Sequence, residues 1–285
     1  MQVTCPLCQL PLTNSERRWH CSNQHSFDIA KQGYCNLLAV QHKKSRAPGD
    51  NATMVEARHR FLSSGFYQSI SQGVCQLARD VISSQSPGNT NKNIKTNIID
   101  AGCGEGYYSC ELFEQLNQHN IHTDMMGIDI AKPAVLHAAK RNKAIRWFVA
   151  NSSRIPVANH SADIILSLFS PIPAAEFHRC LKPNGTLILA TTGEQHLIEL
   201  RERLYDTVKT DTFQPQADLL ERFTATQSTT ITETIHLTNN QQVQDLFAMT
   251  PHYWRVSPER KTVLDSLAPL DLSLDVKLHL YTAKH

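Results

Sequence analysis

A glycine-rich turn between a buried strand and a helix constrains the fold of this chain more than any other stretch of its sequence. In the segment NIIDAGCGEGYYS, Ile98 and Ile99 end a buried strand and Asp100 follows them directly. Three alternate glycines come next, at Gly102, Gly104 and Gly106. The segment YYSCELFEQLNQ then continues as a helix. Because an open α/β sheet holds nucleotide-like ligands at the carboxyl ends of its strands, this order of elements predicts such a ligand here.

The spacing of the glycines distinguishes two kinds of nucleotide-binding turn. A nicotinamide dinucleotide fingerprint, G-x-G-x-x-G, would require a third glycine at position 107, where Tyr107 stands. The observed pattern is D-x-G-x-G-x-G, which resembles the first motif of class I methyltransferases that use S-adenosylmethionine (SAM). An ordinary tight turn is the alternative interpretation of a glycine turn taken alone.

The segments after the turn alternate between strands and helices. MMGIDIA reads as a second strand that ends in Asp129, an acidic residue where ribose hydroxyls would find an acceptor. Residues 132–142 read as a helix, and IRWFVANSS as a third strand that ends near Asn151. ADIILSLFS, entered through Asp163, and CLKPNGTLILATT supply a fourth and a fifth strand. This alternation predicts an α/β fold, the Rossmann-like doubly wound sheet of class I SAM-dependent methyltransferases.

Two further stretches complete the expected body. Between Leu272 and Leu280, leucine and valine alternate with other residues over a period of two, which predicts a late antiparallel strand at the edge of the sheet. Between Ser83 and Thr96, a polar stretch rich in Pro, Gly and Asn predicts a loop that leads into the main domain.

Three cysteines and a histidine at the start of the chain have the spacing of metal ligands. Two residues separate Cys5 from Cys8, and three separate Cys21 from His25. Two ligands so close on a turn can reach one ion together, and a second pair closes a tetrahedron. Thiolate and imidazole ligands suit Zn²⁺, and four protein ligands leave no open coordination position. We therefore predict a structural zinc site that supplies the folding free energy of this short polar segment.

Other uses of these four residues are alternatives at this point. A redox Cys-x-x-Cys pair follows a thioredoxin-like strand, for which the residues before Cys5 leave no room. Unliganded thiols are the other alternative, although core cysteines rarely come as two successive pairs. If one ligand of the predicted set is wrong, His20 or Cys35 is its substitute.

Composition narrows the class of protein. With 285 residues, 41% of them hydrophobic, the chain can bury a full core and has room for one large domain and a small one. No run of eighteen apolar residues and no secretory signal is present, so we expect neither a membrane span nor export. Eight cysteines without an export signal favour reduced thiols or metal ligands over disulfides, which indicates a cytoplasmic enzyme.

The net charge of +2 hides an uneven distribution. Residues 1–60 hold 8 Lys/Arg and 4 Asp/Glu, whereas the rest of the chain holds 20 and 22. A solvated surface is one interpretation of such a short basic stretch, and a polyanion-binding module beside the metal site is the other. On the second interpretation five residues are candidate RNA contacts: Lys43, Lys44, Arg46, Arg58 and Arg60.

Several segments together resemble one family, the bacterial 23S rRNA (guanine-N1)-methyltransferases of the RlmA type. They are the opening Cys/His segment, FDIAKQGYCNLL, QHKKSRAPGDNATMVEARHRFLSSGFY, DAGCGEGYY and MTPHYWR, and they run from Cys5 to about Arg255. The resemblance implies a small zinc-ribbon-like domain joined to a class I methyltransferase body, with SAM as methyl donor and a homodimer as the assembly. The implied substrate is a guanine in a domain II hairpin of 23S rRNA, with neither DNA nor a membrane as partner.

On this basis we expect three parts: a zinc-binding RNA-recognition head over 1–36, a basic helical connector over 37–92, and the SAM-dependent methyltransferase domain over 93–285. The resemblance implies that the zinc ligands are Cys5, Cys8, Cys21 and His25. It places cofactor contacts at Tyr67, Gly104, Glu105 and His196. The strand ends and the glycine turn add five candidates for cofactor binding: Asp100, Gly102, Gly106, Asp129 and Asn151.

Each of the less obvious cofactor contacts has an ordinary structural alternative. Tyr67 could be a core aromatic residue, and His196 could cap the helix that follows the fifth strand. This chain also has TTGEQH before that helix, where relatives commonly have a proline-rich turn.

The chemistry of N1 methylation requires the guanine N1 to lose its proton, with help from a base or from a hydrogen bond to O6. After the fourth strand the chain reads SPIP, which lacks the consecutive prolines and the aromatic residue of adenine-amine methyltransferases. No side chain identifies itself as the base, because His178 and Glu176 lie on a helix where structural roles are commoner. A small-molecule methyltransferase and a non-catalytic RNA-binding protein are the two other classes that share part of this pattern.

Overall fold

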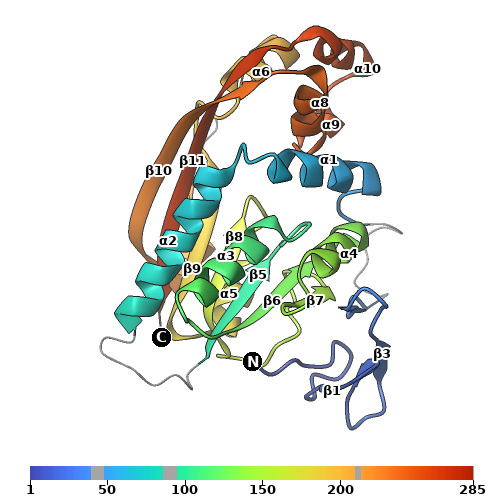
Figure 1. Ribbon diagram of the computed structural model, residues 1–285. Coiled ribbons are helices and arrows are strands. Elements are labelled where there is room, and N and C mark those ends of the chain that lie inside the picture. The colour runs from blue at the N-terminus through green and yellow to red at the C-terminus, as the bar shows by residue number, and fades with distance from the viewer. Residues whose placement is uncertain (40–47, 86–94, 209–212, 285) are drawn as a thin grey trace.

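The computed structural model describes residues 1–39, 48–85, 95–208 and 213–284. Within them the largest element is an eight-stranded mixed sheet (Figure 1). Its strands follow one another across the sheet in the order β10 (Phe223–Leu237), β11 (Leu270–Ala283), β9 (Leu181–Thr192), β8 (Ala162–Leu168), β5 (Thr96–Ala101), β6 (Thr123–Asp129), β7 (Arg146–Val149) and β4 (Tyr34–Asn36).

The centre of this sheet is parallel and one side of it is antiparallel. All neighbouring strands from β9 to β4 pair in parallel, whereas β11 and β10 run antiparallel to their neighbours. The carboxyl ends of the parallel strands therefore meet at the same edge, where an open α/β sheet binds ligands. The predicted doubly wound parallel sheet is confirmed for β5 to β9.

The prediction that residues 272–280 form the edge strand was wrong in one respect. These residues lie in β11, which is antiparallel as expected, but β10 pairs with its outer side along fourteen positions. Strand β10 gave no clear signal because its sequence, TATQSTTITET, is polar on both faces and largely exposed. A strand segment that is mostly exposed on both faces needs no apolar alternation. The alternation in β11 instead reflects packing on one face with two hydrogen-bonded neighbours.

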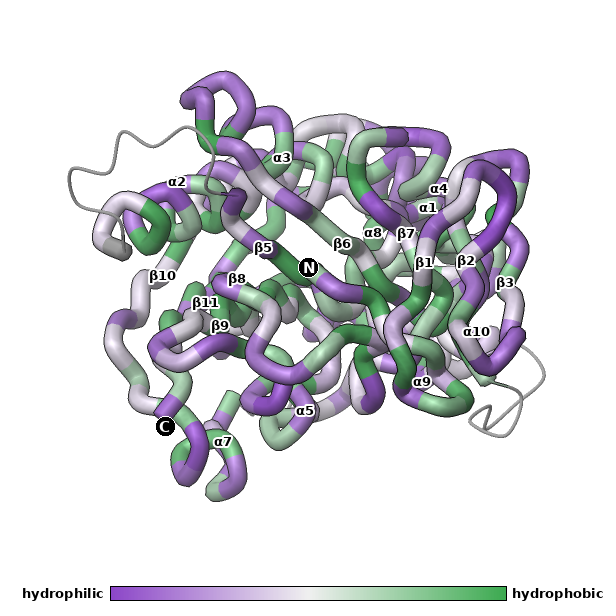
Figure 2. The backbone as a smooth tube through the Cα atoms, turned by 90° about the horizontal axis from the view of Figure 1, so that it is seen from below, coloured by the Kyte–Doolittle hydropathy of each residue, from purple (hydrophilic) through white to green (hydrophobic). Residues whose placement is uncertain are grey.

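Helices cover both faces of the sheet (Figure 2). On one face lie α2 (Gln68–Gln85), α3 (Tyr107–Gln118) and α4 (Lys132–Arg141), and on the other lie α5 (Ala174–Cys180) and α7 (Ala217–Arg222). Consecutive residues of β5 point to opposite faces, so that Ile98 belongs to the first apolar core and Ile99 to the second. Burial on both faces explains why the central strands read as unbroken apolar runs.

The remaining helices gather at the carboxyl edge of the sheet (Figure 1). They are α1 (Ala52–Ser63), α6 (Ile198–Leu204), α8 (Asn240–Ala248), α9 (His252–Arg255), α10 (Pro258–Lys261) and a 3₁₀ helix, η2 (Thr262–Ser266). Helix α1 begins at Asn51, whose side chain accepts a hydrogen bond from the N–H of Met54, and it packs against α8. No helix in the described ranges has both the length and the apolarity needed to cross a bilayer.

The N-terminal residues form a small three-stranded antiparallel sheet, β1 (Thr13–Ser15), β2 (Arg18–His20) and β3 (Ser26–Asp28). This small sheet packs on the same face as α5, where the Trp19 ring meets the Phe148 ring edge-on at a centroid distance of 5.5 Å. The chain then enters the main sheet as β4, which pairs in parallel with β7. The predicted head over 1–36 therefore shares both a strand and an apolar core with the body.

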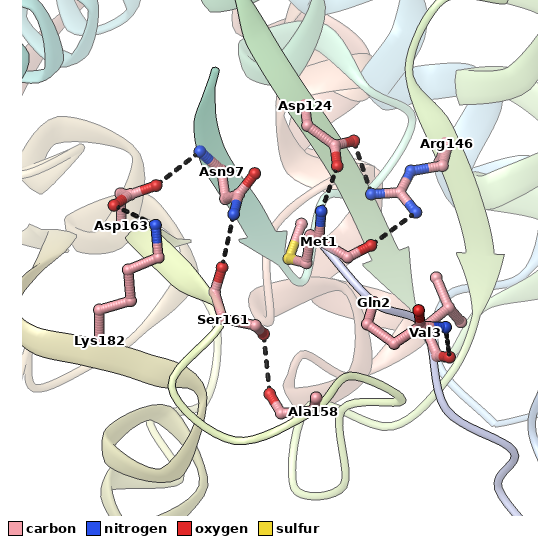
Figure 3. Close-up of polar contacts among 10 residues, drawn as sticks. All are labelled: Met1, Gln2, Val3, Asn97, Asp124, Arg146, Ala158, Ser161, Asp163 and Lys182. Atoms are coloured by element: carbon pink, nitrogen blue, oxygen red, sulfur yellow. Dashed lines mark hydrogen bonds and ion pairs between the residues drawn. The ribbon is translucent and has the colours of Figure 1, made fainter. Parts of the chain in front are cut away.

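Polar contacts add to this attachment at the amino ends of β6 and β7 (Figure 3). The Met1 ammonium and Arg146 both bind the carboxylate of Asp124, each at 2.6 Å. Burial alone would raise the pKa of Asp124, but these two cations hold it below its usual range. The N–H of Thr4 also donates to the carbonyl of Pro156 at 2.9 Å. The first residues are thus fixed both to the amino ends of β6 and β7 and to the segment between β7 and β8.

We predict that Gly127→Ala destabilises the sheet, because Gly127 lies directly beside Trp147 on the neighbouring strand. A Cβ at this position would come within 2.2 Å of the Trp147 ring, which is itself buried. Overpacking of this kind costs about 1–3 kcal/mol. Thermal unfolding of the variant should show a melting temperature lower by about 2–4 °C for each kcal/mol.

The control is Trp147→Leu, alone and combined with Gly127→Ala. If the steric account is right, the smaller side chain makes room, and the double variant is more stable than the sum of the single effects allows. Strictly additive losses would contradict it.

Candidate functional site

The four predicted metal ligands come together in the head. The ligand atoms of Cys5, Cys8, Cys21 and His25 all lie within 4.8 Å of one another. His25 Nδ1 is 3.5 Å from the sulfurs of Cys5 and Cys21, and the sulfurs of Cys8 and Cys21 are 3.7 Å apart. A tetrahedral zinc site with ordinary bond lengths has sulfur–sulfur edges of about 3.8 Å and sulfur–nitrogen edges of about 3.5 Å. The donor set therefore fits zinc in both chemistry and size.

The two substitute ligands lie outside this group. Cys35 is in β4 and its thiol donates to the carbonyl of Phe27. His20 precedes Cys21 directly but is not part of the cluster. Because all four donors belong to the protein, the site has no position for a substrate, and a structural role follows.

A cleft of about 1280 Å³ opens at the carboxyl edge of the main sheet. Its walls come from the glycine turn after β5, the ends of β6, β8 and β9, helix α1, and residues 249–255. Eight of the nine predicted cofactor residues line it: Tyr67, Asp100, Gly102, Gly104, Glu105, Asp129, Asn151 and His196. The ninth, Gly106, lies behind the turn, where an added Cβ would meet Ala138 at 2.9 Å.

Asp100 lies at the floor of this cleft. One of its carboxylate oxygens accepts a hydrogen bond from the Ser109 hydroxyl at 2.5 Å. The other oxygen is buried and has no partner among the described residues. Burial raises the pKa of Asp100 to about 7. A buried carboxylate with one unsatisfied oxygen is suited to a cationic group of a ligand.

Asp129 and Glu105 line the same cleft but are engaged differently. The Asp129 carboxylate accepts from the N–H groups of Gly104 at 3.0 Å and Ala131 at 2.7 Å, and it keeps further lone pairs for a ligand. Glu105 is buried and binds Arg141 of α4 at 2.7 Å. Its negative charge is therefore already paired with a cation of the protein.

Tyr67 and His196 meet across the cleft. The Tyr67 hydroxyl lies 3.4 Å from His196 Nε2, while His196 Nδ1 accepts from the N–H of Asp275 at 3.4 Å. Burial lowers the pKa of His196 to about 4, so the imidazole is neutral at neutral pH. With Nδ1 as acceptor, the proton sits on Nε2 and points toward Tyr67. Both residues are buried and both face the cleft, so each has a structural contact as well as a position in the site.

The basic residues proposed to contact RNA fall into two groups. Lys43, Lys44 and Arg46 lie outside the described residues. Arg58 binds the carboxylate of Asp50 and the carbonyl of Met249, and Arg60 binds the carboxylate of Asp245. These two arginines therefore join α1 to the loop before it and to α8.

The cleft also contains residues that were not among the predicted site residues. The Tyr205 hydroxyl and His252 Nδ1 share a hydrogen bond of 2.9 Å. Burial lowers the pKa of His252 to about 4. Phe213 and Trp254 also line the cleft, and so does Phe169, which follows β8 next to the glycine turn. Phe169 and Phe213 belong to no motif of their own, whereas His252 and Trp254 lie in the segment MTPHYWR that carries the family resemblance. The helix residues considered as bases, His178 and Glu176, do not line the cleft.

Comparison with known proteins agrees with this division into a metal-binding head and a cleft-bearing body. The family model described as "RlmA, N-terminal", a zinc ribbon, matches residues 3–46, and a model described as "Methyltransferase domain" matches residues 98–185. A Bacillus subtilis (strain 168) protein named "Putative 23S rRNA (guanine-N(1)-)-methyltransferase YxjB" is 32% identical over 282 residues, which cover 96% of this chain and 94% of that protein. The chain belongs to the RlmA-type methyltransferase family.

Two actinobacterial proteins give the same result. A Micromonospora griseorubida protein with the corresponding name is 31% identical over 98% of this chain and 96% of its own length. A Streptomyces fradiae "23S rRNA (guanine(748)-N(1))-methyltransferase" is 31% identical over 71% of this chain and 67% of its own length. The RlmA-type chain is accordingly a SAM-dependent enzyme with a class I methyltransferase fold and a structural zinc, as predicted.

We predict that Cys8→Ser removes the zinc from the RlmA-type head, because a hydroxyl replaces one of three thiolates. Elemental analysis should find zinc in about a one-to-one ratio in the unaltered protein. It should find little in the variant. SAM affinity should suffer less, because no described residue of the head lines the cleft.

Cys75→Ser is the matched control, since Cys75 is a buried cysteine of α2 outside the cluster. It should retain the metal. Unchanged zinc content in Cys8→Ser would contradict the prediction.

Proposed function

We propose that this enzyme transfers a methyl group from SAM to N1 of a guanine in a domain II hairpin of 23S rRNA. The observation that carries the proposal is the near full-length likeness to proteins named for this reaction, which includes both the zinc ribbon and the methyltransferase body. A methyltransferase of small molecules would need the body but not the head. A non-catalytic RNA-binding protein would not need a cleft lined by the glycine turn, Asp100 and Asp129.

The residues of the cleft fit SAM in charge as well as in place. Asp100 offers an unpaired carboxylate oxygen to the ammonium of the methionyl group, and Asp129 offers acceptor lone pairs to the ribose hydroxyls. Gly102 and Gly104 let the backbone approach the ligand, and Asn151 and the Tyr67–His196 pair complete the lining. Glu105, which is neutralised by Arg141, holds the turn in place.

SAM supplies an electrophilic methyl group, so the protein's part is positioning, desolvation and removal of the N1 proton. The target N1 lies on the Watson–Crick edge, which means that the guanine must leave its stack to enter the cleft. His196 and His252 both have a pKa of about 4 and are weak bases at neutral pH. Neither is therefore suited to take the N1 proton before the methyl group is transferred.

The same resemblance supports three finer proposals. First, the hairpin is held by the head and by a basic stretch made of Lys43, Lys44, Arg46, Arg58 and Arg60. Second, the enzyme is a homodimer. Third, it works in the cytoplasm. Arg58 and Arg60 already bind carboxylates of this chain, so the lysines are expected to supply most of the salt-sensitive contacts.

The proposed reaction is tested by mapping reverse-transcription stops on 23S rRNA from a strain that lacks this enzyme. A methyl group on N1 blocks base pairing, so one stop in a domain II hairpin should disappear and return with the purified enzyme and SAM. Unchanged stops, together with methylation of a small molecule by the same preparation, would overturn the proposal.

We predict that SAM binding releases a proton from Asp100 and strengthens with pH up to about 7. In the free protein this carboxyl has a pKa of about 7, so it is largely protonated below that value. The cationic ligand favours the carboxylate and lowers the pKa in the complex, so affinity falls as pH drops from 7 toward the pKa of the complex. Calorimetry in buffers of different ionisation enthalpy measures the released proton.

Asp100→Asn should bind SAM more weakly and without this pH dependence, whereas Asp271→Asn, at an exposed position, should behave like the unaltered protein. A pH-independent SAM affinity in the unaltered protein would contradict the prediction.

We also predict that replacing Lys43 and Lys44 together by Ala weakens hairpin binding and lowers the slope of log affinity against log salt by about one to two units. Turnover at saturating RNA should hardly change, since phosphate contacts position the substrate only. The control pair is Lys277 and Lys284, at the opposite end of the chain. Identical salt titrations for the variant and the unaltered protein would contradict the assignment.

A further inference from the structure

One residue of the cleft combines a strained backbone with an exposed apolar side chain. Phe169, directly after β8, has φ of +55°, in the left-handed region that phenylalanine rarely adopts. Its side chain lines the cleft, and 41% of its surface is exposed. Among the described non-glycine residues with positive φ, the other large apolar one is Leu197, which is 1% exposed. Core packing accounts for Leu197, but not for Phe169.

The surrounding structure holds this backbone conformation in place. The N–H of Phe169 donates to the carbonyl of Ala190 in β9 at 2.9 Å. The next residue, Ser170, donates from its hydroxyl to the carbonyl of Ala101 at 2.8 Å. Ser170 also lies so close to Gly102 that a Cβ there would be 2.6 Å away. The segment therefore cannot relax toward ordinary dihedrals without separating β8 from the glycine turn.

This arrangement places an aromatic side chain next to the glycine turn. Strand β8 pairs with β5, and Leu166 lies opposite Asp100, so Phe169 follows β8 at the edge where the glycine turn follows β5. Tyr108 is an aromatic neighbour of Phe169 in the described structure, at a tilted centroid distance of 6.3 Å, and 41% of Phe169 stays exposed. A partly exposed ring on a constrained backbone beside a cofactor site is suited to stack on a planar base.

We propose that Phe169 is the stacking residue for the target guanine after it has left the RNA helix. The proposal rests on the proposed function, since it assigns a role in binding that substrate. The strained backbone presents the ring to the base, in keeping with the observation that such strain concentrates at functional sites. Stacking holds the purine plane without reading its edge, so that N1 stays open toward the methyl donor.

A second exposed aromatic residue in the cleft provides the matched control. Trp254 is 65% exposed and belongs to the short helix α9, with ordinary backbone geometry. If it contacts RNA, it does so at the mouth of the cleft. Its replacement should therefore weaken binding of the hairpin whether or not the target base is present.

The experiment measures coupling between one side chain and one base. Hairpin RNAs that carry an abasic site at each guanine in turn are titrated, by fluorescence anisotropy, into the unaltered protein, Phe169→Ala and Trp254→Ala, all with S-adenosylhomocysteine present. In the unaltered protein, loss of the target base should weaken binding by about 5- to 100-fold. Phe169→Ala should bind the intact hairpin as weakly as the unaltered protein binds the hairpin that lacks the target base. Its affinity should not fall further when that base is removed. Trp254→Ala should still show the full difference in affinity between the intact and the abasic hairpin.

The coupled guanine must also be the one that the enzyme methylates. Two results would overturn this inference while leaving the proposed function intact. One is methylation of a hairpin guanine whose removal shows no coupling to Phe169. The other is coupling of that guanine to Trp254 instead. Absence of methylation at every guanine would overturn the proposed function itself. Phe169→Tyr and Phe169→Trp should retain the coupling, because both keep an aromatic face.

Two further readouts exclude a merely structural role. SAM affinity of Phe169→Ala, measured by calorimetry, should stay within about twofold of the unaltered protein, and a large loss would assign the ring to the cofactor instead. Phe169→Gly should melt about 2–4 °C above Phe169→Ala, because glycine adopts positive φ without strain, yet it should show the same loss of coupling. Equal melting temperatures would contradict the strain on which the inference depends.

Discussion

One carboxylate holds together the part of the molecule on which the cleft depends. Asp129, at the end of β6, accepts hydrogen bonds from the N–H groups of Gly104 and Ala131, so it joins the glycine turn after β5 to the start of α4. Since β6 lies between β5 and β7 in the sheet, this one side chain fixes two neighbouring crossover connections relative to each other. The conformation of the turn thus depends on how β5 and β6 are aligned. The glycines allow the positive φ angles of that conformation but do not select it.

The fold was predictable wherever burial imposes a pattern. The strands at the centre of the sheet are covered on both faces, and their apolar runs, the glycine turn and helix α3 were placed correctly because each of these signals is local. Strands β10 and β4 were missed for the opposite reason. Strand β10 is polar on both faces, and β4 has three residues whose partner, β7, lies more than a hundred positions away. No local pattern can specify a pairing of that kind.

The site was predictable to the extent that its residues stand in short motifs. The four metal ligands and the ends of β5 and β6 follow from spacing, whereas Tyr67 and His196 followed only from the family resemblance. The charges of Arg58 and Arg60 were read as RNA contacts; the structure pairs Arg58 with Asp50 in the loop before α1 and Arg60 with Asp245 of the distant helix α8. Phe169 could not be singled out from the sequence, because it is distinguished by a backbone φ angle that the local sequence does not encode.

The attachment of the small N-terminal sheet to the body bears on how one guanine is chosen among neighbours. Because β4 continues the main sheet and Trp19 packs on Phe148, the zinc-binding head and the body that bears the cleft share a sheet and an apolar core. If the head binds the hairpin as proposed, the distance from the zinc cluster to the cleft determines how far along the stem the methylated nucleotide lies. Substitutions that change the spacing between Trp19 and Phe148 would then change which nucleotide is methylated, without altering any group that contacts the base.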